Sequence, residues 1–369
     1  MAYASIPKNK AHFTSVRYTG SDSTTTISGL DFQPDIVWTK NMDTGSTNWN
    51  CVDSTRGNTS NMYLNTNDDA ETATRVASFT SDGLTLTGNE SSTNNASDNY
   101  ITQLFKINGG TTSSNGDGSI TATVQANASA GMSVVKYTGT GSAATVGHGL
   151  GQKPDYIIIK RINNATGYWT IYSSKFNSDD NSSFSTDPET DYIELGHSGG
   201  LTDDNTRFND TAPTTSVFSI GTANAVNNST SDYVAYCFVG IKGFSHVGLY
   251  RGNGTNDSAF VYTGGKPRMV LIKSMTAGGK WVMQDYGMNY NRLQGSGNQY
   301  FMTPENTNAK EAQTDGQYSG HGVSWIDFRA NGFKISTSNA WLGDGYKYLY
   351  IAFLEEPIVS TNGVPATAR

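Results

Sequence analysis

The sequence predicts an all-β protein made of three tandem β-sandwich repeats, with a jelly-roll or lectin-like sandwich as the first choice. The first observation is composition: charged residues make up 15% of the 369, against about 25% in an average soluble domain, while Gly (40), Tyr (20), Phe (15) and Trp (6) are frequent. Aromatic residues suit pleated surfaces, and Gly, Asn and Asp supply the positive φ angles of turns. The other two observations are an internal repeat and strand-like segments within it.

The repeat consists of three kinds of anchor that recur in the same order. Each copy opens on a short segment that contains a tyrosine followed closely by a glycine, and these tyrosines are Tyr18, Tyr137 and Tyr250. A proline then starts an apolar run that ends in lysine, at 34–40, 154–160 and 267–273. A tryptophan follows at a matched distance, as Trp49, Trp169 and Trp281, and an aromatic segment closes each copy at 100–105, 233–238 and 348–353. The spacing is that of a whole domain, longer than a solenoid repeat.

Each copy has the pattern of strands joined by turns. Proline at the start of the apolar run is tolerated because the first strand position needs no N–H for the ladder. The run 157–159 is three isoleucines, so it is expected in the middle of a sheet covered on both faces. Hairpins are predicted at 79–86 and 328–335, and no helix is expected. Short strands in this number around a buried tryptophan are typical of a β-sandwich.

These boundaries give the expected domain organisation. A lead of residues 1–12 precedes the first sandwich at 13–108, and a connector at 109–131 leads to the second at 132–243. The third sandwich is expected at 244–356, followed by an extended C-terminal tail at 357–369. The connector is polar enough for a flexible linker, but 120–124 alternates, so part of it is also compatible with an edge strand. Only a few residues separate the second and third sandwiches, which predicts a rigid joint.

Charge and cysteine usage exclude several classes of function. The net charge is −7 with no basic cluster, so no nucleic-acid partner is expected. No stretch reaches the roughly 18 consecutive apolar residues of a membrane helix, and the N-terminus lacks a signal-peptide pattern. Membrane insertion and secretion by a signal peptide are therefore not expected. Cys51 and Cys237 lie in apolar, strand-like contexts and are interpreted as buried free thiols.

No catalytic residues are predicted, and we do not expect an enzyme. None of the five histidines forms a metal-ligand pair with a nearby residue, and His148 lies in a glycine-rich turn where a structural role is favoured. No nucleophile elbow or Cys/His dyad can be assembled. A polysaccharide depolymerase stays as a remote alternative, because such an enzyme would need a defined carboxylate site or long β-helical repeats.

No cofactor and no metal site is predicted, although Ca²⁺ stays open as an alternative. Paired acids in Asn/Ser-rich loops offer the oxygen ligands that Ca²⁺ prefers, and they lie at 68–69, 179–180 and 203–204. None of these segments has EF-hand spacing. Carboxylates in polar turns are more often simply solvated.

The candidate binding residues lie in the third repeat, between Trp281 and Trp325. They are Tyr286, Tyr290, Arg292, Tyr300 and Tyr318. Aromatic faces stack on the C–H surfaces of sugars, and Arg satisfies hydroxyls, so a glycan site is one interpretation. Packing against another subunit or against the same sandwich is the stronger alternative, because tyrosine-rich surfaces serve assembly equally well.

With these residues in view, the chain resembles a family of uncharacterised virion proteins of tailed, mainly marine, bacteriophages. The matching segments, which span nearly the whole chain, are MAY (1–3), FTSVRYTG (13–20), FQPDIVWTK (32–40), DGSI (117–120), HGLG (148–151), NDTAPT (209–214) and PATAR (365–369). The resemblance implies a tail-fibre-like or other structural role in the virion, and it brings no catalytic residues.

The expected function is therefore a virion structural protein, most simply a tail fibre or appendage component that also attaches to a host-surface glycan. The expected partners are copies of itself, with a trimer favoured among cyclic assemblies, and other virion proteins. The expected location is the tail or particle surface, after synthesis in the host cytoplasm. A capsid decoration or head-fibre protein is the alternative, since both use small β modules.

Overall fold

The computed structural model describes residues 8–163, 167–176, 187–276, 278–288, 300–312 and 325–355. Its strand ladders are antiparallel throughout the described residues, so the all-β prediction is confirmed. The expected C-terminal tail at 357–369 lies outside the described residues, as do residues 1–7 of the expected lead. A short 3₁₀ helix, η1 (Asn9–Ala11), precedes the first strand.

The first sandwich pairs a large sheet with a small one. The large sheet has the order β1-β9-β3-β4-β5-β6 and the small sheet the order β2-β8-β7. Their bounds are β1 (Phe13–Thr19), β2 (Thr25–Ile27), β3 (Ile36–Asn41), β4 (Asn50–Asp53), β5 (Ser60–Tyr63), β6 (Glu71–Thr72), β7 (Val76–Thr80), β8 (Gly83–Leu86) and β9 (Asn99–Phe105). Apolar side chains from both sheets, among them Val37, Leu84 and Leu104, form the core between them.

The second sandwich has a wider large sheet, in the order β10-β11-β12-β19-β14-β15-β16-β17, and a small sheet β13-β18. The bounds are β10 (Ser113–Asn115), β11 (Ala122–Asn127), β12 (Met132–Thr138), β13 (Ala144–Gly147), β14 (Tyr156–Arg161), β15 (Trp169–Ser173), β16 (Asp191–Leu195), β17 (Thr202–Asp203), β18 (Val217–Ile220) and β19 (Asp232–Phe238). β10 and β11 come from the expected connector, so this segment pairs as strands in the large sheet.

The third sandwich repeats the arrangement. Its large sheet has the order β20-β28-β22-β23, and small sheets β21-β27-β26 and β24-β25 accompany it. The bounds are β20 (Ser245–Arg251), β21 (Phe260–Tyr262), β22 (Pro267–Ser274), β23 (Trp281–Asp285), β24 (Tyr300–Phe301), β25 (Glu311–Ala312), β26 (Ile326–Arg329), β27 (Gly332–Ile335) and β28 (Lys347–Leu354). Val261, Ile272, Phe333 and Tyr348 belong to the core that joins the sheets.

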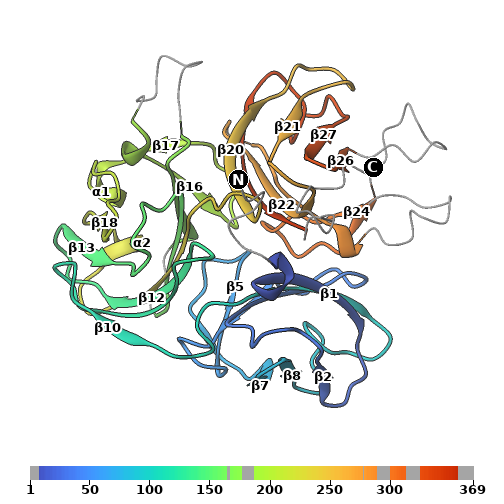
Figure 1. Cartoon of the computed structure of the whole chain (residues 1–369), viewed down its shortest axis with the longest axis horizontal. Helices are drawn as coiled ribbons and strands as arrows, with labels where there is room; N and C mark the ends of the chain where they lie inside the picture. The colour runs from blue at the N-terminus through green and yellow to red at the C-terminus, as the bar shows by residue number, and fades with distance from the viewer. Residues whose placement is uncertain are drawn as a thin grey trace, which may run out of the picture.

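One strand order recurs in the described part of all three sandwiches. The order β1-β9-β3-β4 corresponds to β12-β19-β14-β15 and to β20-β28-β22-β23. In each, the opening strand pairs with the closing strand, which pairs in turn with the run that ends in lysine. Figure 1 shows the three sandwiches grouped around a common centre, the first in blue, the second in green and the third in yellow to red. The exact repeat boundaries stay a prediction.

The local predictions can be checked residue by residue. The two predicted hairpins form as β7–β8 and β26–β27. The three repeat tryptophans are buried, and every residue of β14 is buried, as expected for a strand covered on both faces. Both cysteines are buried and free, which confirms their interpretation as unpaired thiols.

Two short α-helices in the described residues were not predicted. They are α1 (Asn205–Phe208) and α2 (Asn224–Asn227), of four residues each. α1 forms because the Asp204 carboxylate accepts a hydrogen bond from the Thr206 N–H and because Asn209 adopts a left-handed conformation at its end. Each helix is too short for its apolar residues to show a helical period in the sequence. No helix in the described part of the chain is both long and apolar enough to cross a membrane.

The three sandwiches meet at a cluster of phenylalanines. The last aromatic residues of the closing strands, Phe105, Phe238 and Phe353, lie together, with ring centroids 5.2 Å apart for Phe105–Phe353, 5.9 Å for Phe238–Phe353 and 6.2 Å for Phe105–Phe238. Phe13 joins them from β1 at 4.7 Å from Phe353. The Asn9 side chain also ties η1 to this centre, donating to the carbonyls of Gly243, at the end of the second sandwich, at 2.6 Å and of Glu355 in the third at 3.0 Å. The centre of the molecule is therefore one continuous apolar core.

Buried lysines tie each sandwich to a neighbour. The three lysines that end the repeated apolar runs each donate to a carbonyl of their own sandwich and to one of the next. Lys40 reaches Thr307 of the third sandwich at 3.1 Å, Lys160 reaches Thr66 of the first at 3.3 Å, and Lys273 reaches Ser198 of the second at 3.1 Å. The links form a closed cycle. Burial lowers the pKa of each lysine to about 8.

Replacing Lys40 with methionine tests this cycle. We expect the free energy of unfolding at pH 7 to fall by about 1–3 kcal/mol, because the carbonyls of Thr47 and Thr307 stay buried without a donor. The folded pKa of about 8 lies below the ordinary value of 10.5, so the unfolded state binds more protons between these values and stability contributed by this group rises with pH there. Urea unfolding at pH 7, 8 and 9.5 measures both effects. The half-exposed Lys136 changed to methionine is the control, and an unchanged pH slope in Lys40→Met would contradict the assignment.

The residue after the repeated proline fixes the end of its own sandwich. Asp35 accepts hydrogen bonds from the backbone N–H groups of Ile107, Gly109 and Gly110, at 2.7 to 2.9 Å. Asp155 accepts one from Gly240 at 2.9 Å. The third sandwich has Arg268 at this position, and its guanidinium pairs instead with Glu355 at 3.4 Å. The same location therefore carries opposite charge in the third sandwich.

Candidate functional site

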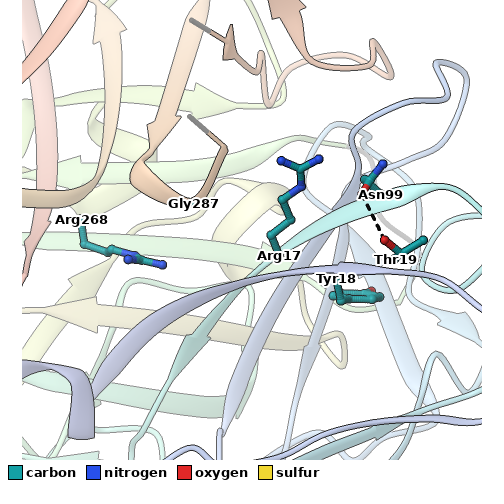
Figure 2. Close-up of a pocket in the computed structure, with 6 residues that line it drawn as sticks. All are labelled: Arg17, Tyr18, Thr19, Asn99, Arg268 and Gly287. Carbon is teal, nitrogen blue, oxygen red and sulfur yellow. Dashed lines mark hydrogen bonds between the residues drawn. The ribbon is translucent and has the colours of Figure 1, made fainter. Parts of the chain in front are cut away.

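A hollow of about 540 Å³ lies where the first and third sandwiches meet. Its lining residues are Arg17, Tyr18, Thr19, Asn99, Arg268 and Gly287, shown in Figure 2. The first four come from the paired ends of β1 and β9, and the last two come from β22 and from the segment after β23. We call it the first–third hollow.

Arg17 brings an available positive charge to this hollow. Phe13, Ser15, Arg17 and Thr19 lie on one face of β1. Phe13 and Ser15 are buried there against the third sandwich, whereas Arg17 and Thr19, towards the end of the strand, are exposed. Within the described part of the chain, no hydrogen bond or ion pair of the Arg17 guanidinium is found. Thr19 donates to the Asn99 side-chain oxygen at 3.2 Å (Figure 2). The Asn99 amide donates to the Asp43 carboxylate at 2.7 Å, which leaves its second N–H as a further donor.

Arg268 is, by contrast, held in place from several sides. Its Nε donates to the Ser15 hydroxyl and its Nη2 to the Ser15 carbonyl, both at 2.7 Å. Ser15 in turn donates to the Asp285 carboxylate at 2.7 Å. Asp285 is buried, and this burial raises its pKa. The arrangement fixes the wall of the hollow by contacts that cross from the first sandwich to the third.

Tyr286 lies beside this wall. Its ring is covered by two cations, the Lys266 ammonium at 4.1 Å and the Arg268 guanidinium at 5.7 Å from the ring centroid. Gly287, the next residue along the chain, lines the hollow itself. Cation–π contacts of this kind fix an aromatic ring and concentrate positive charge around it. The region therefore combines an aromatic ring, three basic side chains, a hydroxyl and an amide.

The predicted binding residues are only partly brought together. Tyr286 adjoins the first–third hollow, and Tyr300 lies in β24 with the Lys310 ammonium 5.4 Å from its ring centroid. Tyr290, Arg292 and Tyr318 lie outside the described residues. Whether the five form one site stays a prediction.

The sequence reasoning missed the residues that the first sandwich contributes. Arg17 lies in a repeat anchor and Asn99 directly before one, and neither was singled out as a binding residue. The period of two in 13–19 places Arg17 on the same face as the buried Phe13 and Ser15, so the local pattern gives no signal of its exposure. No local pattern could report that the third sandwich would face it.

The paired acids have structural surroundings where they are described. Asp203 lies in β17 and Asp204 caps α1, while 68–69 lies in a loop and 179–180 is outside the described residues. Across the described ranges, no group of three or more His, Cys, Asp or Glu side chains is arranged to hold a metal ion. The Ca²⁺ alternative is left without a located site.

The fold and the hollow together define an all-β protein of packed sandwiches with a basic, hydroxyl- and amide-lined depression between two of them. The chain belongs to the family described as "Domain of unknown function (DUF7483)", whose model matches residues 8–357. No curated protein and no solved structure matches the chain.

Proposed function

We propose that the chain is a structural protein of a bacteriophage virion, a tail fibre or appendage component that also adheres to a host-surface glycan. It acts without catalysis. The observation that carries the structural part is the closed cycle of buried lysine contacts between sandwiches. The proposal that the protein belongs to a virion rests on the resemblance to tailed-phage virion proteins.

The cycle supports a mechanical role because it holds the sandwiches in fixed positions relative to one another. Residues far apart in the sequence share one apolar core, and each sandwich supplies hydrogen-bond acceptors to the buried cation of another. Bending one sandwich relative to the others would leave buried polar groups unpaired, which is costly. A body of this kind suits an appendage that transmits force and needs no internal motion.

Particle membership and assembly test the structural proposal. We expect the protein in purified particles, with antibody labelling on the tail, and we expect the isolated protein to scatter light as a trimer. Labelling on the head shell would favour a decoration or head-fibre protein instead. A monomer that is missing from purified particles would overturn the proposal.

The first–third hollow supports the adhesive part of the proposal. A guanidinium donates several hydrogen bonds to hydroxyl or carboxylate groups, and the Asn99 amide and Thr19 hydroxyl add shorter-range polar contacts. Tyr286 adds an aromatic ring at the edge, with the Lys266 and Arg268 cations over it. These are the groups that hold a sugar by its hydroxyls and its C–H face.

Changing Arg17 to alanine tests this site. We expect glycan binding and adsorption to host cells to fall about ten- to a hundredfold, since charge-assisted hydrogen bonds contribute about 1.5–3 kcal/mol. Thermal stability should be unchanged because the side chain is exposed. Arg329→Ala, at an exposed arginine of β26, is the matched control. Normal adsorption by the Arg17 variant would exclude this hollow as the adhesive site.

A further inference from the structure

We infer that the groove between the second and third sandwiches is a separate site for an acidic sugar residue. The inference rests on the proposed adhesive function and names the class of ligand that this second site takes. The groove has a volume of about 360 Å³. Among its lining residues are Asp155, Lys175, Lys242, His246, Tyr262 and Thr263. We call it the second–third groove.

One wall of the groove is built from the same repeat positions as one wall of the first–third hollow. Asp155 and Arg268 each follow the repeated proline of their sandwich, and each lies on the wall of its depression. Lys175 and Gly287 each lie two residues beyond the end of the corresponding strand, β15 or β23. The opposite wall comes from the opening strand of the following sandwich, from the start of β20 in one case and from the end of β1 in the other. Two depressions at two junctions would give one chain two points of attachment.

An exposed aromatic ring lies at the rim of the second–third groove. Tyr262 is 62% exposed, which is unusual for so large a side chain, and it ends β21 just before the turn at Gly264. Gly264 has φ of +82°, a conformation that a side chain would strain, so the turn holds the tyrosine at the rim. Phe260, two residues earlier on the same strand, is 48% exposed on the same face. Exposed aromatic faces of this kind stack on the C–H surface of a sugar ring.

The charges of the groove favour an anion. The Lys175 ammonium pairs with the Asp155 carboxylate at 3.0 Å, so these two charges cancel. Lys242 is exposed, and no partner of its ammonium is found among the described residues. The net charge of the whole chain is −7, so a groove whose net charge is positive is a local exception. A carboxylate is the group that this lysine would recognise.

Neutral donors and acceptors complete the site. The His246 Nδ1 and the Tyr350 hydroxyl are 2.9 Å apart, so the ring is held through one nitrogen and the other is left for a ligand. Thr263 is buried and donates to the Gly265 carbonyl at 2.7 Å, which fixes this part of the wall. An aromatic platform, one unpaired cation and neutral polar groups match a sugar that carries a carboxylate. A neutral sugar would leave Lys242 unused.

Calorimetric titration of the full chain tests the inference, with oligogalacturonate as the acidic probe and a cello-oligosaccharide of equal length as the neutral one. We expect the acidic probe to bind about tenfold or more tightly than the neutral one. Tyr262→Ala and Lys242→Ala should each weaken acidic binding by about tenfold or more. Tyr346→Ala and Lys136→Ala change an exposed tyrosine and a half-exposed lysine outside the groove, and should bind like the parent.

The other outcomes separate this inference from the function it rests on. If the acidic probe binds and the binding is lost in Arg17→Ala but kept in Tyr262→Ala, the adhesive function stands and the second site is wrong. Equal binding of both probes would overturn the acidic specificity. Competition by inorganic phosphate at equal concentration would show a simple anion site and overturn the sugar assignment. If neither probe binds, while the protein is found on particles, the inference fails and the structural role survives.

Discussion

Replacing Phe353 with alanine is expected to lower the free energy of unfolding by about 3–5 kcal/mol, the usual effect of removing a buried phenylalanine ring. Its ring contacts those of Phe13, Phe105, Phe238 and Phe244, with centroid distances from 4.7 to 5.9 Å. These partners come from all three sandwiches, so the cavity would open where no single sandwich can close around it. Urea unfolding followed by tryptophan fluorescence measures the change.

A matched control is Phe260→Ala, because that ring is nearly half exposed and fills no core. It should change stability by less than about 0.5 kcal/mol. Since the three sandwiches share the core, the parent should unfold in one transition and Phe353→Ala should move that transition as a whole. Separate transitions for separate sandwiches would contradict a shared centre.

Replacing Arg56 with methionine is expected to cost about 3–5 kcal/mol as well, for an electrostatic reason. Arg56 and Asp53 form an ion pair whose side chains are almost wholly buried. Asp53 also accepts a hydrogen bond from the Tyr236 hydroxyl at 2.7 Å, which extends the cluster from the first sandwich into the second. Without the guanidinium, the Asp53 carboxylate would stay buried with no cation beside it.

The double variant Asp53→Asn with Arg56→Met separates charge from packing. It removes both charges, so we expect it to regain a substantial part of the stability lost in Arg56→Met. Chemical denaturation of the parent, both single variants and the double variant gives the coupling free energy. A double variant no more stable than Arg56→Met would mean that the guanidinium acts only through its packing.

The sequence predicted what depends on local pattern. The strand character of the repeated runs, the burial of their tryptophans and the two hairpins follow from side-chain periodicity and turn residues. The two short helices were not predicted because four residues carry no period, and the caps of α1 depend on the folded conformations of Asp204 and Asn209.

What the sequence could not report is contact between segments far apart along the chain. Lysine at the end of an apolar run has the pattern of a strand reaching solvent, yet Lys40 is buried because carbonyls of the third sandwich meet it there. The candidate site divides in the same way. Tyr286 was predicted because it lies in a tyrosine-rich segment. Arg17, by contrast, belongs to the site only because the third sandwich lies against β1.

The third sandwich has Arg268 at the position where the first two have aspartate. This difference bears on how the chain avoids misfolding. Proteins made of similar repeats are prone to misassembly, in which one repeat takes the place of another. In the place of Asp35, an arginine would meet three inward-pointing N–H donors, and in the place of Arg268 an aspartate would meet Glu355. Both mismatches set like charges or dipoles against each other. A chemical difference at one position of a threefold pattern thus gives the nascent chain a single cyclic order in which to close.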